Sequence, residues 1–237
     1  MRKDGTPGAP GAGGAAPRWL LTLAEVALAG LTAAGVVGLS RLFRDGSFLL
    51  PVLAFALAAH ALAAACRRLH LAAGISAVLA GGVLIAGISI FLLPGTTLAG
   101  IPTGATLEEA RRQLADALTA FREVVAPAPV EPGFVLAAAV AAWIVAFVAD
   151  TAAFRAKARV EAAVPAATLF VFGAALGAPP RRVPVTALFL AALVAYWLTQ
   201  RVLLHWGAPQ RLGPPEAAGA GPHSLLRSGA LLGAVAV

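Results

Sequence analysis

The stretch FVLAAAVAAWIVAFVADTAAF, from Phe134 to Phe154, decides the fold class. Asp150 is its one charged residue. A bilayer core about 30 Å thick requires roughly 20 apolar residues in a helix, because each residue rises about 1.5 Å. The backbone polar groups in such a core must be satisfied within the segment itself. The stretch therefore predicts a helix that crosses a membrane.

Five further segments meet the same requirement, so the sequence predicts an all-α, multi-spanning transmembrane bundle. The six complete helices are expected at Trp19–Leu39, Phe48–Cys66, Leu69–Leu93, Phe134–Phe154, Val160–Ala178 and Val183–Leu204.

The composition agrees with an integral membrane protein. Hydrophobic residues make up 59% of the chain, charged residues 12%, and the mean hydropathy is +0.85. The formal charge of +7 is spread over single or paired basic residues rather than one patch, which argues against nucleic-acid binding. One cysteine, Cys66, excludes an internal disulfide, and we interpret it as a small apolar residue at a helix end.

Four parts are expected along the chain. Residues 1–18 are rich in Gly, Pro and Ala and predict a disordered tail, with a cleaved signal peptide as the less favoured reading. Residues 19–206 form the transmembrane domain, which includes an extracytoplasmic loop at 94–133. Residues 207–223 are expected to be a cytoplasmic linker. Residues 224–237 begin a seventh apolar run too short to span, which indicates either a re-entrant end or a truncated helix.

Basic residues near the helix ends predict the orientation. With the N-terminus in the cytoplasm, 11 Lys and Arg fall on the inner side and 7 on the outer side. We therefore expect a multi-pass protein of the plasma membrane with a cytoplasmic N-terminus.

The long outer loop contains a predicted amphipathic helix at 106–125. Its apolar residues recur at spacings of three and four, Thr106 and Glu109 are expected to form a capping box, and three prolines follow it. This helix is expected to lie on the outer membrane surface or cap the bundle, where envelope proteins could contact it. A solvated hairpin helix is the alternative.

Three ionisable residues, Glu25, His60 and Asp150, lie within the predicted spans. Each is about 7 to 9 Å from the inner end of its helix, so all three share one depth. Since a charged group in a membrane costs about 2.5 to 3.5 kcal/mol, each requires a partner. A proton or ion relay is one interpretation. We favour interhelical hydrogen bonds that fix packing, with Arg67, Arg68, Arg155 or Lys157 as partners.

The usual phosphate-loop, dinucleotide, zinc-protease and serine-nucleophile patterns do not occur in the sequence. We accordingly predict no catalytic, cofactor-binding or metal-binding residue and no enzymatic activity for this chain.

The order of several short phrases adds a resemblance. PGTTLAGIPTGATLEEARRQLADAL is followed by APAPVEPG, then by a helix that ends FVADTAA, then by VEAAVPAATLF. This order resembles the N-terminal membrane domain of bacterial transglutaminase-like proteins of the TgpA type, in the version found in actinobacteria. The resemblance implies that the helices precede an extracytoplasmic papain-like domain with a Cys-His-Asp triad, none of which is present in this sequence.

From these observations we expect a membrane anchor and scaffold of a transglutaminase-like envelope protein. A small transporter or channel that uses Glu25, His60 and Asp150 is the alternative. A third possibility is an envelope-assembly or sensor protein that binds partners through the outer helix.

Overall fold

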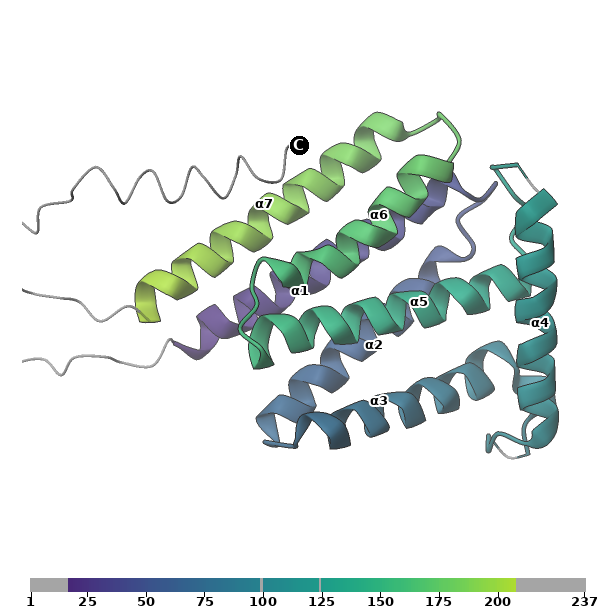
Figure 1. Cartoon of the computed structure of the whole chain (residues 1–237), viewed down its shortest axis with the longest axis horizontal. Helices are drawn as coiled ribbons and strands as arrows, with labels where there is room; N and C mark the ends of the chain where they lie inside the picture. Colours follow the sequence, from purple (N-terminus) through teal and green to yellow (C-terminus); the bar gives the residue numbers. More distant parts are fainter. Residues whose placement is uncertain (1–16, 99, 124, 208–237) are drawn as a thin grey trace, which may run out of the picture. The chain divides into compact units, whose positions relative to one another are not determined.

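The computed structural model describes residues 17–98, 100–123 and 125–207, and these residues form seven α-helices and no named strand. The predicted all-helical class is confirmed (Figure 1). The helices are α1 Arg18–Gly38, α2 Leu49–Arg68, α3 Ala73–Gly87, α4 Gly104–Glu123, α5 Pro132–Asp150, α6 Val164–Leu176 and α7 Arg182–Gly207.

Short turns of tighter or wider helix extend several of these elements. These short turns are Leu39–Arg41 after α1, Ile88–Leu92 after α3, Pro94–Thr96, Thr151–Arg155 after α5 and Glu161–Ala163 before α6. With these extensions, five helices among the described residues are long and apolar enough to cross a membrane. The segment predicted at Val160–Ala178 is shorter, because its apolar helix runs only from Glu161 to Leu176.

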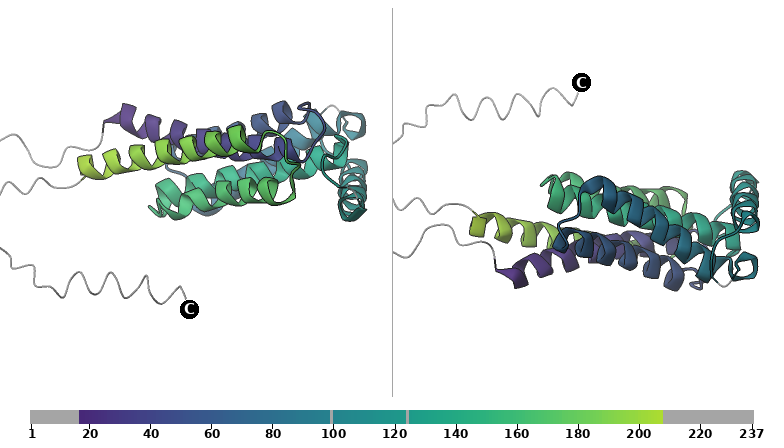
Figure 2. Two further views of the ribbon diagram at one scale, coloured as in Figure 1. Left: turned by 90° about the horizontal axis from the view of Figure 1, so that it is seen from above. Right: turned by 90° about the horizontal axis from the view of Figure 1, so that it is seen from below.

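Six helices run side by side in alternating directions, and α4 lies across one end of them (Figures 1 and 2). Helix α5 is central, because it packs against α1, α2, α4 and α6. We call the end covered by α4 the α4 end and the opposite end, where α1 begins and α2 and α5 finish, the cluster end.

The α2–α5 interface is built largely from alanine. Ala59, Ala139, Ala142 and Ala146 are fully buried in one core cluster, and the rings of Trp143 and Phe55 meet edge to face with their centroids 6.2 Å apart. Small side chains allow two helix backbones to approach closely, which increases the number of van der Waals contacts. The alanine-rich composition of these helices is therefore a packing feature.

Glycines allow a similarly close approach between α1 and α6. A Cβ atom on Gly173 would lie 2.6 Å from the backbone oxygen of Gly38, and one on Gly35 would lie 2.9 Å from the oxygen of Ala166. A side chain at Gly173 would meet backbone rather than a movable side chain. These two helices can keep their spacing only while glycine occupies the contact.

Helix α3 leaves most of its apolar surface uncovered. Only Ser76 and Ala80 are buried on it, whereas Val78 is 76% exposed and Ile75 and Ile85 are each 55% exposed. A helix with so much exposed aliphatic surface is atypical of a protein in water, since large apolar patches mark sites of contact with another apolar phase or molecule.

The start of α4 differs from the prediction. The helix begins at Gly104, and Thr106 lies in its first turn, where its hydroxyl accepts a hydrogen bond from the Thr103 N–H at 3.0 Å and donates to the oxygen of Thr96 at 2.8 Å. Glu109 instead accepts hydrogen bonds from Arg112 and Gln113. The predicted capping box of Thr106 and Glu109 is therefore wrong, because Thr103 already occupies the position before the helix.

The third span begins at Ala73, four residues after the start expected at Leu69. Residues 69–72 form a turn between α2 and α3, in which the Leu71 N–H donates to the oxygen of Cys66 and His70 has a φ of 55°. Hydropathy alone did not reveal this turn, because Leu69 and Leu71 continue the apolar pattern.

Three predicted parts fall on the ends of the chain. The linker at 207–223 and the partial seventh helix at 224–237 lie outside the described residues, apart from Gly207. The predicted tail at 1–18 also lies outside them, except for Pro17 and Arg18, which precede and begin α1.

Candidate functional site

The three ionisable residues singled out in the sequence come together at the cluster end of the bundle. Glu25 lies on α1, His60 lies on α2, and Asp150 is the last residue of α5. Arg67 of α2 lies at the centre of the group: it bonds to Glu25 and to Asp150, and His60 lies beside Asp150. We call Glu25, His60, Arg67, Arg68 and Asp150 the polar cluster.

Arg67 joins two carboxylates that belong to different helices. Its Nη1 donates a hydrogen bond to Oδ1 of Asp150, and its Nη2 donates to Oε1 of Glu25 at 2.5 Å. Its guanidinium carbon also lies 4.3 Å from the ring centre of Phe154, a favourable position for a cation beside an aromatic face. Arg67 therefore ties α2 to both α1 and α5.

Arg68 completes the charge balance. Its Nη2 donates to the second oxygen of Glu25 at 2.6 Å. With His60 neutral, the cluster contains two arginines and two carboxylates, so no net charge is left between the helices. A balanced set of this kind is the form in which charged groups are tolerated away from water.

The interior of the cluster is shielded from solvent. The side chains of Asp150 and His60 are 3% and 8% exposed, and those of Arg67 and Glu25 are 15% and 20% exposed. The side chain of Arg68, by contrast, is 65% exposed. Asp150 depends most on its partner, because it has the least access to water.

His60 is held by a hydroxyl group of the neighbouring helix. Its Nε2 lies 3.0 Å from Oγ1 of Thr32, and that hydroxyl donates its own proton to the oxygen of Leu28 at 3.2 Å. When the Thr32 hydroxyl donates to Leu28, Nε2 carries the ring proton and donates to Thr32. The other ring nitrogen, Nδ1, is buried without a hydrogen-bond partner among the described residues and lies 3.9 Å from Oδ2 of Asp150.

A second polar link lies beside the cluster. Arg155 donates to the oxygen of Leu71 at 2.8 Å and to Oγ of Ser76 at 2.7 Å, which joins the end of α5 to the α2–α3 turn and to α3. Lys157, one of the four predicted partners, is exposed and follows the end of the helix with a φ of 57°.

Sequence reasoning named the carboxylates and the arginines but missed Thr32 and Ser76. Both hydroxyls also bond to the carbonyl four residues earlier in their own helix. A Ser or Thr in a helix can make this hydrogen bond within its own segment. The sequence of an apolar segment therefore gives no signal that the hydroxyl also bonds to a side chain of another helix.

The chain matches the TgpA N-terminal domain over residues 30–237. The chain belongs to the TgpA N-terminal domain family. The resemblance inferred from the sequence is thereby confirmed. No curated protein and no solved structure matches the chain.

The polar cluster of this TgpA N-terminal domain pairs both carboxylates with arginines and leaves one ring nitrogen of His60 without a hydrogen bond among the described residues. The two carboxylates bond to arginines, and the proton on His60 Nε2 leads to Thr32, whose own proton ends on a backbone oxygen. The one open position is Nδ1 of His60, which could accept a single proton and would then face Asp150. The geometry can therefore fix three helices relative to one another and can hold one proton.

Proposed function

We propose that this chain is the membrane domain of a TgpA-like transglutaminase protein, which it anchors and supports in the cell envelope. Membership of the TgpA N-terminal domain family supports the assignment to a TgpA-like protein, and five long apolar helices support the location in a membrane. The uncovered aliphatic surface of α3 supports contact with lipid. On this proposal the chain alone has no transferase or protease activity.

Six crossings are proposed, although α6 is short. Helices α5 and α7 run in opposite senses from α6, so α6 connects the cluster end to the α4 end. The rise from Glu161 to Leu176 is about 24 Å, against a bilayer core of about 30 Å. Buried Arg41 satisfies backbone oxygens at and beyond the end of this short helix, because it donates hydrogen bonds to the oxygens of Ala174, Gly177 and Ala178. The backbone there can therefore remain away from water although the helix has ended.

The proposed orientation places the cluster end in the cytoplasm and α4 outside, at the membrane surface. Among described residues the two ends carry equal numbers of Lys and Arg, so the inner excess rests on Arg2, Lys3, Arg211 and Arg227, which lie outside the described residues.

One observation favours an anchor over a transporter: arginine holds both carboxylates of the polar cluster. A relay requires groups that pass a proton onward, whereas both carboxylates here are held by arginines and the Thr32 proton is donated within α1. The cluster therefore supports a fixed packing of α1, α2 and α5.

Reconstitution separates the two functions. The purified chain is placed in liposomes that contain a pH-sensitive dye, and a pH or potential gradient is applied. The anchor proposal expects the same proton flux as in empty liposomes, and expects the chain to stay in the membrane fraction after an alkaline wash. A flux that depends on the protein and disappears in Asp150→Asn would contradict it, as would transferase activity of the chain.

A further inference from the structure

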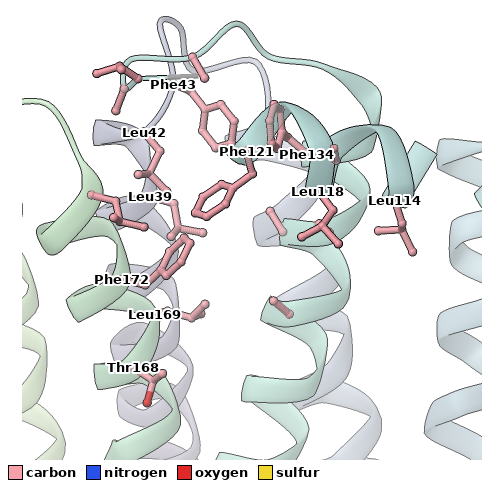
Figure 3. A pocket seen from close by; sticks show the side chains of 18 residues that line it. Leu39, Leu42, Phe43, Leu114, Leu118, Phe121, Phe134, Thr168, Leu169 and Phe172 are labelled. Carbon is pink, nitrogen blue, oxygen red and sulfur yellow. The ribbon is translucent and has the colours of Figure 1, made fainter. Parts of the chain in front are cut away.

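A large apolar pocket lies beneath α4, at the opposite end of the bundle from the polar cluster (Figure 3). Its volume is about 830 Å³, within the range of cavities that bind ligands. Helices α5 and α6 form its sides, the turn after α1 contributes Leu39 and Leu42, and α4 contributes Leu114, Leu118 and Phe121. It extends along α6 from Leu176 down to Thr168, a distance of about 12 Å at 1.5 Å per residue.

The lining offers nothing that would recognise a polar ligand. Thr168 has the one side-chain hydroxyl among the lining residues, and it already donates to the oxygen of Val164 at 3.0 Å. The walls are nevertheless left uncovered, since Leu118 is 58% exposed and Phe121 and Leu176 are each 46% exposed. The lining of the pocket therefore suits a hydrocarbon chain.

The guanidinium of Arg44 lies at the rim of this pocket. Arg44 follows the lining residue Phe43, and its Nε donates to the oxygen of Pro127 at 3.3 Å, between the lining residues Ala126 and Ala128. Arg44 is exposed, and its two Nη groups have no hydrogen-bond partner among the described residues. A guanidinium in this state suits an anionic oxygen such as a phosphate.

The position of α4 restricts what can occupy the pocket. A membrane-spanning helix is about 10 Å wide and would continue through both membrane surfaces, but α4 closes the pocket on its outer side (Figure 3). A lipid tail, by contrast, ends at its headgroup and can enter from the side. Its phosphate would then lie at the level of α4 and Arg44.

We propose that this pocket binds an acyl chain of an anionic glycerophospholipid from the outer leaflet, with the lipid phosphate at Arg44. The proposal depends on the membrane placement given under Proposed function. It adds a specific lipid site to a surface that would otherwise contact lipid only in a general way.

The test uses the full chain, purified in a mild detergent and incubated with phosphatidylglycerol or phosphatidylcholine. Native mass spectrometry counts the lipids that each chain retains. Thr168→Trp fills the pocket from α6. Val171→Trp is the matched control, because Val171 is exposed on the same helix and does not line the pocket. Arg44→Gln removes the rim cation, and Arg182→Gln controls for surface charge at the same end.

Wild type and Val171→Trp are expected to retain one phosphatidylglycerol, which Thr168→Trp loses. Arg44→Gln should weaken phosphatidylglycerol binding by about tenfold or more, the loss of one charge-assisted hydrogen bond, whereas Arg182→Gln should change it little. Equal retention by both tryptophan variants would overturn the site, as would a dimer of the chain that only Thr168→Trp abolishes. A chain that leaves the membrane in an alkaline wash would instead refute the proposed function.

Discussion

Replacement of Arg67 by methionine is expected to be among the most destabilising single changes in the domain. Arg67 is the one residue that bonds to carboxylates of two other helices within the polar cluster. Methionine preserves much of the apolar stem but leaves Asp150, whose side chain is 3% exposed, without its cation. The remaining neighbour of that carboxylate is His60, at 3.9 Å.

The expected loss in the free energy of unfolding follows from the burial of the two carboxylates. Removal of one partner from a buried ion pair costs about 3 to 5 kcal/mol. We expect the lower part of this range, because Glu25 is 20% exposed and keeps its hydrogen bond from Arg68. About 3 kcal/mol corresponds to more than a hundredfold change in the ratio of folded to unfolded protein.

Unfolding in mixed detergent micelles, followed by the fluorescence of the four tryptophans, measures this change. Arg68→Met is the matched control. Its side chain is 65% exposed and bonds only to Glu25 within the cluster, so its loss should cost no more than about 1 kcal/mol. The double variant Arg67→Met/Asp150→Asn should recover much of the stability, because the unpaired charge is then gone.

Equal stability of Arg67→Met and Arg68→Met would refute the reasoning. A double variant no more stable than Arg67→Met alone would do the same, since it would show that the buried charge of Asp150 is not the cause.

Three further predictions concern other contacts. Gly173→Leu should lower stability by about 1 to 3 kcal/mol because its Cβ would meet the backbone of α1, whereas Gly30→Leu, which enters open space, should be near neutral in the same unfolding assay. Arg41→Met should raise amide hydrogen exchange at the end of α6, since the partly buried carbonyls of Gly177 and Ala178 lose their donor. Hydrogen bonds from Arg112, and next from Gln113, lower the pKa of Glu109 below its ordinary value. The stabilisation of α4 by this carboxylate is therefore complete at a pH above the ordinary pKa of Glu and is lost as the pH falls through the lowered pKa of Glu109. Amide hydrogen exchange in α4 should accordingly rise on acidification of the wild-type chain and change less in Glu109→Gln.

The sequence predicted the helical class because long apolar segments are a regular signal, and it predicted the family because several short phrases occur in a characteristic order. The helix ends were less predictable. Leu69 and Leu71 lie in a turn and have the hydropathy of a span, and the capping position belongs to Thr103 rather than Thr106. In these places a local hydrogen bond decides the boundary, and hydropathy does not report it.

The polar cluster was predictable in membership but not in geometry. A charged residue in an apolar segment is conspicuous, which identified Glu25 and Asp150 and suggested the nearby arginines. The central place of Arg67 depends on how α1, α2 and α5 pack against one another. That packing uses buried alanines from distant parts of the sequence, so the charged residues alone do not predict it. The apolar pocket gave no sequence signal, because its walls come from five separate parts of the chain: the segment after α1, α4, the loop after α4, α5 and α6.

The central claim, a membrane domain with α4 outside and the polar cluster at the cytoplasmic end, is tested most directly by cysteine accessibility. In a Cys66→Ala background, one cysteine replaces exposed Ala115 on α4 or exposed Ala72 in the α2–α3 turn. Intact cells are treated with a membrane-impermeant maleimide. The account predicts that Ala115→Cys is labelled at once and Ala72→Cys only after the membrane is permeabilised. Labelling of both in intact cells, or of Ala72→Cys alone, would contradict it.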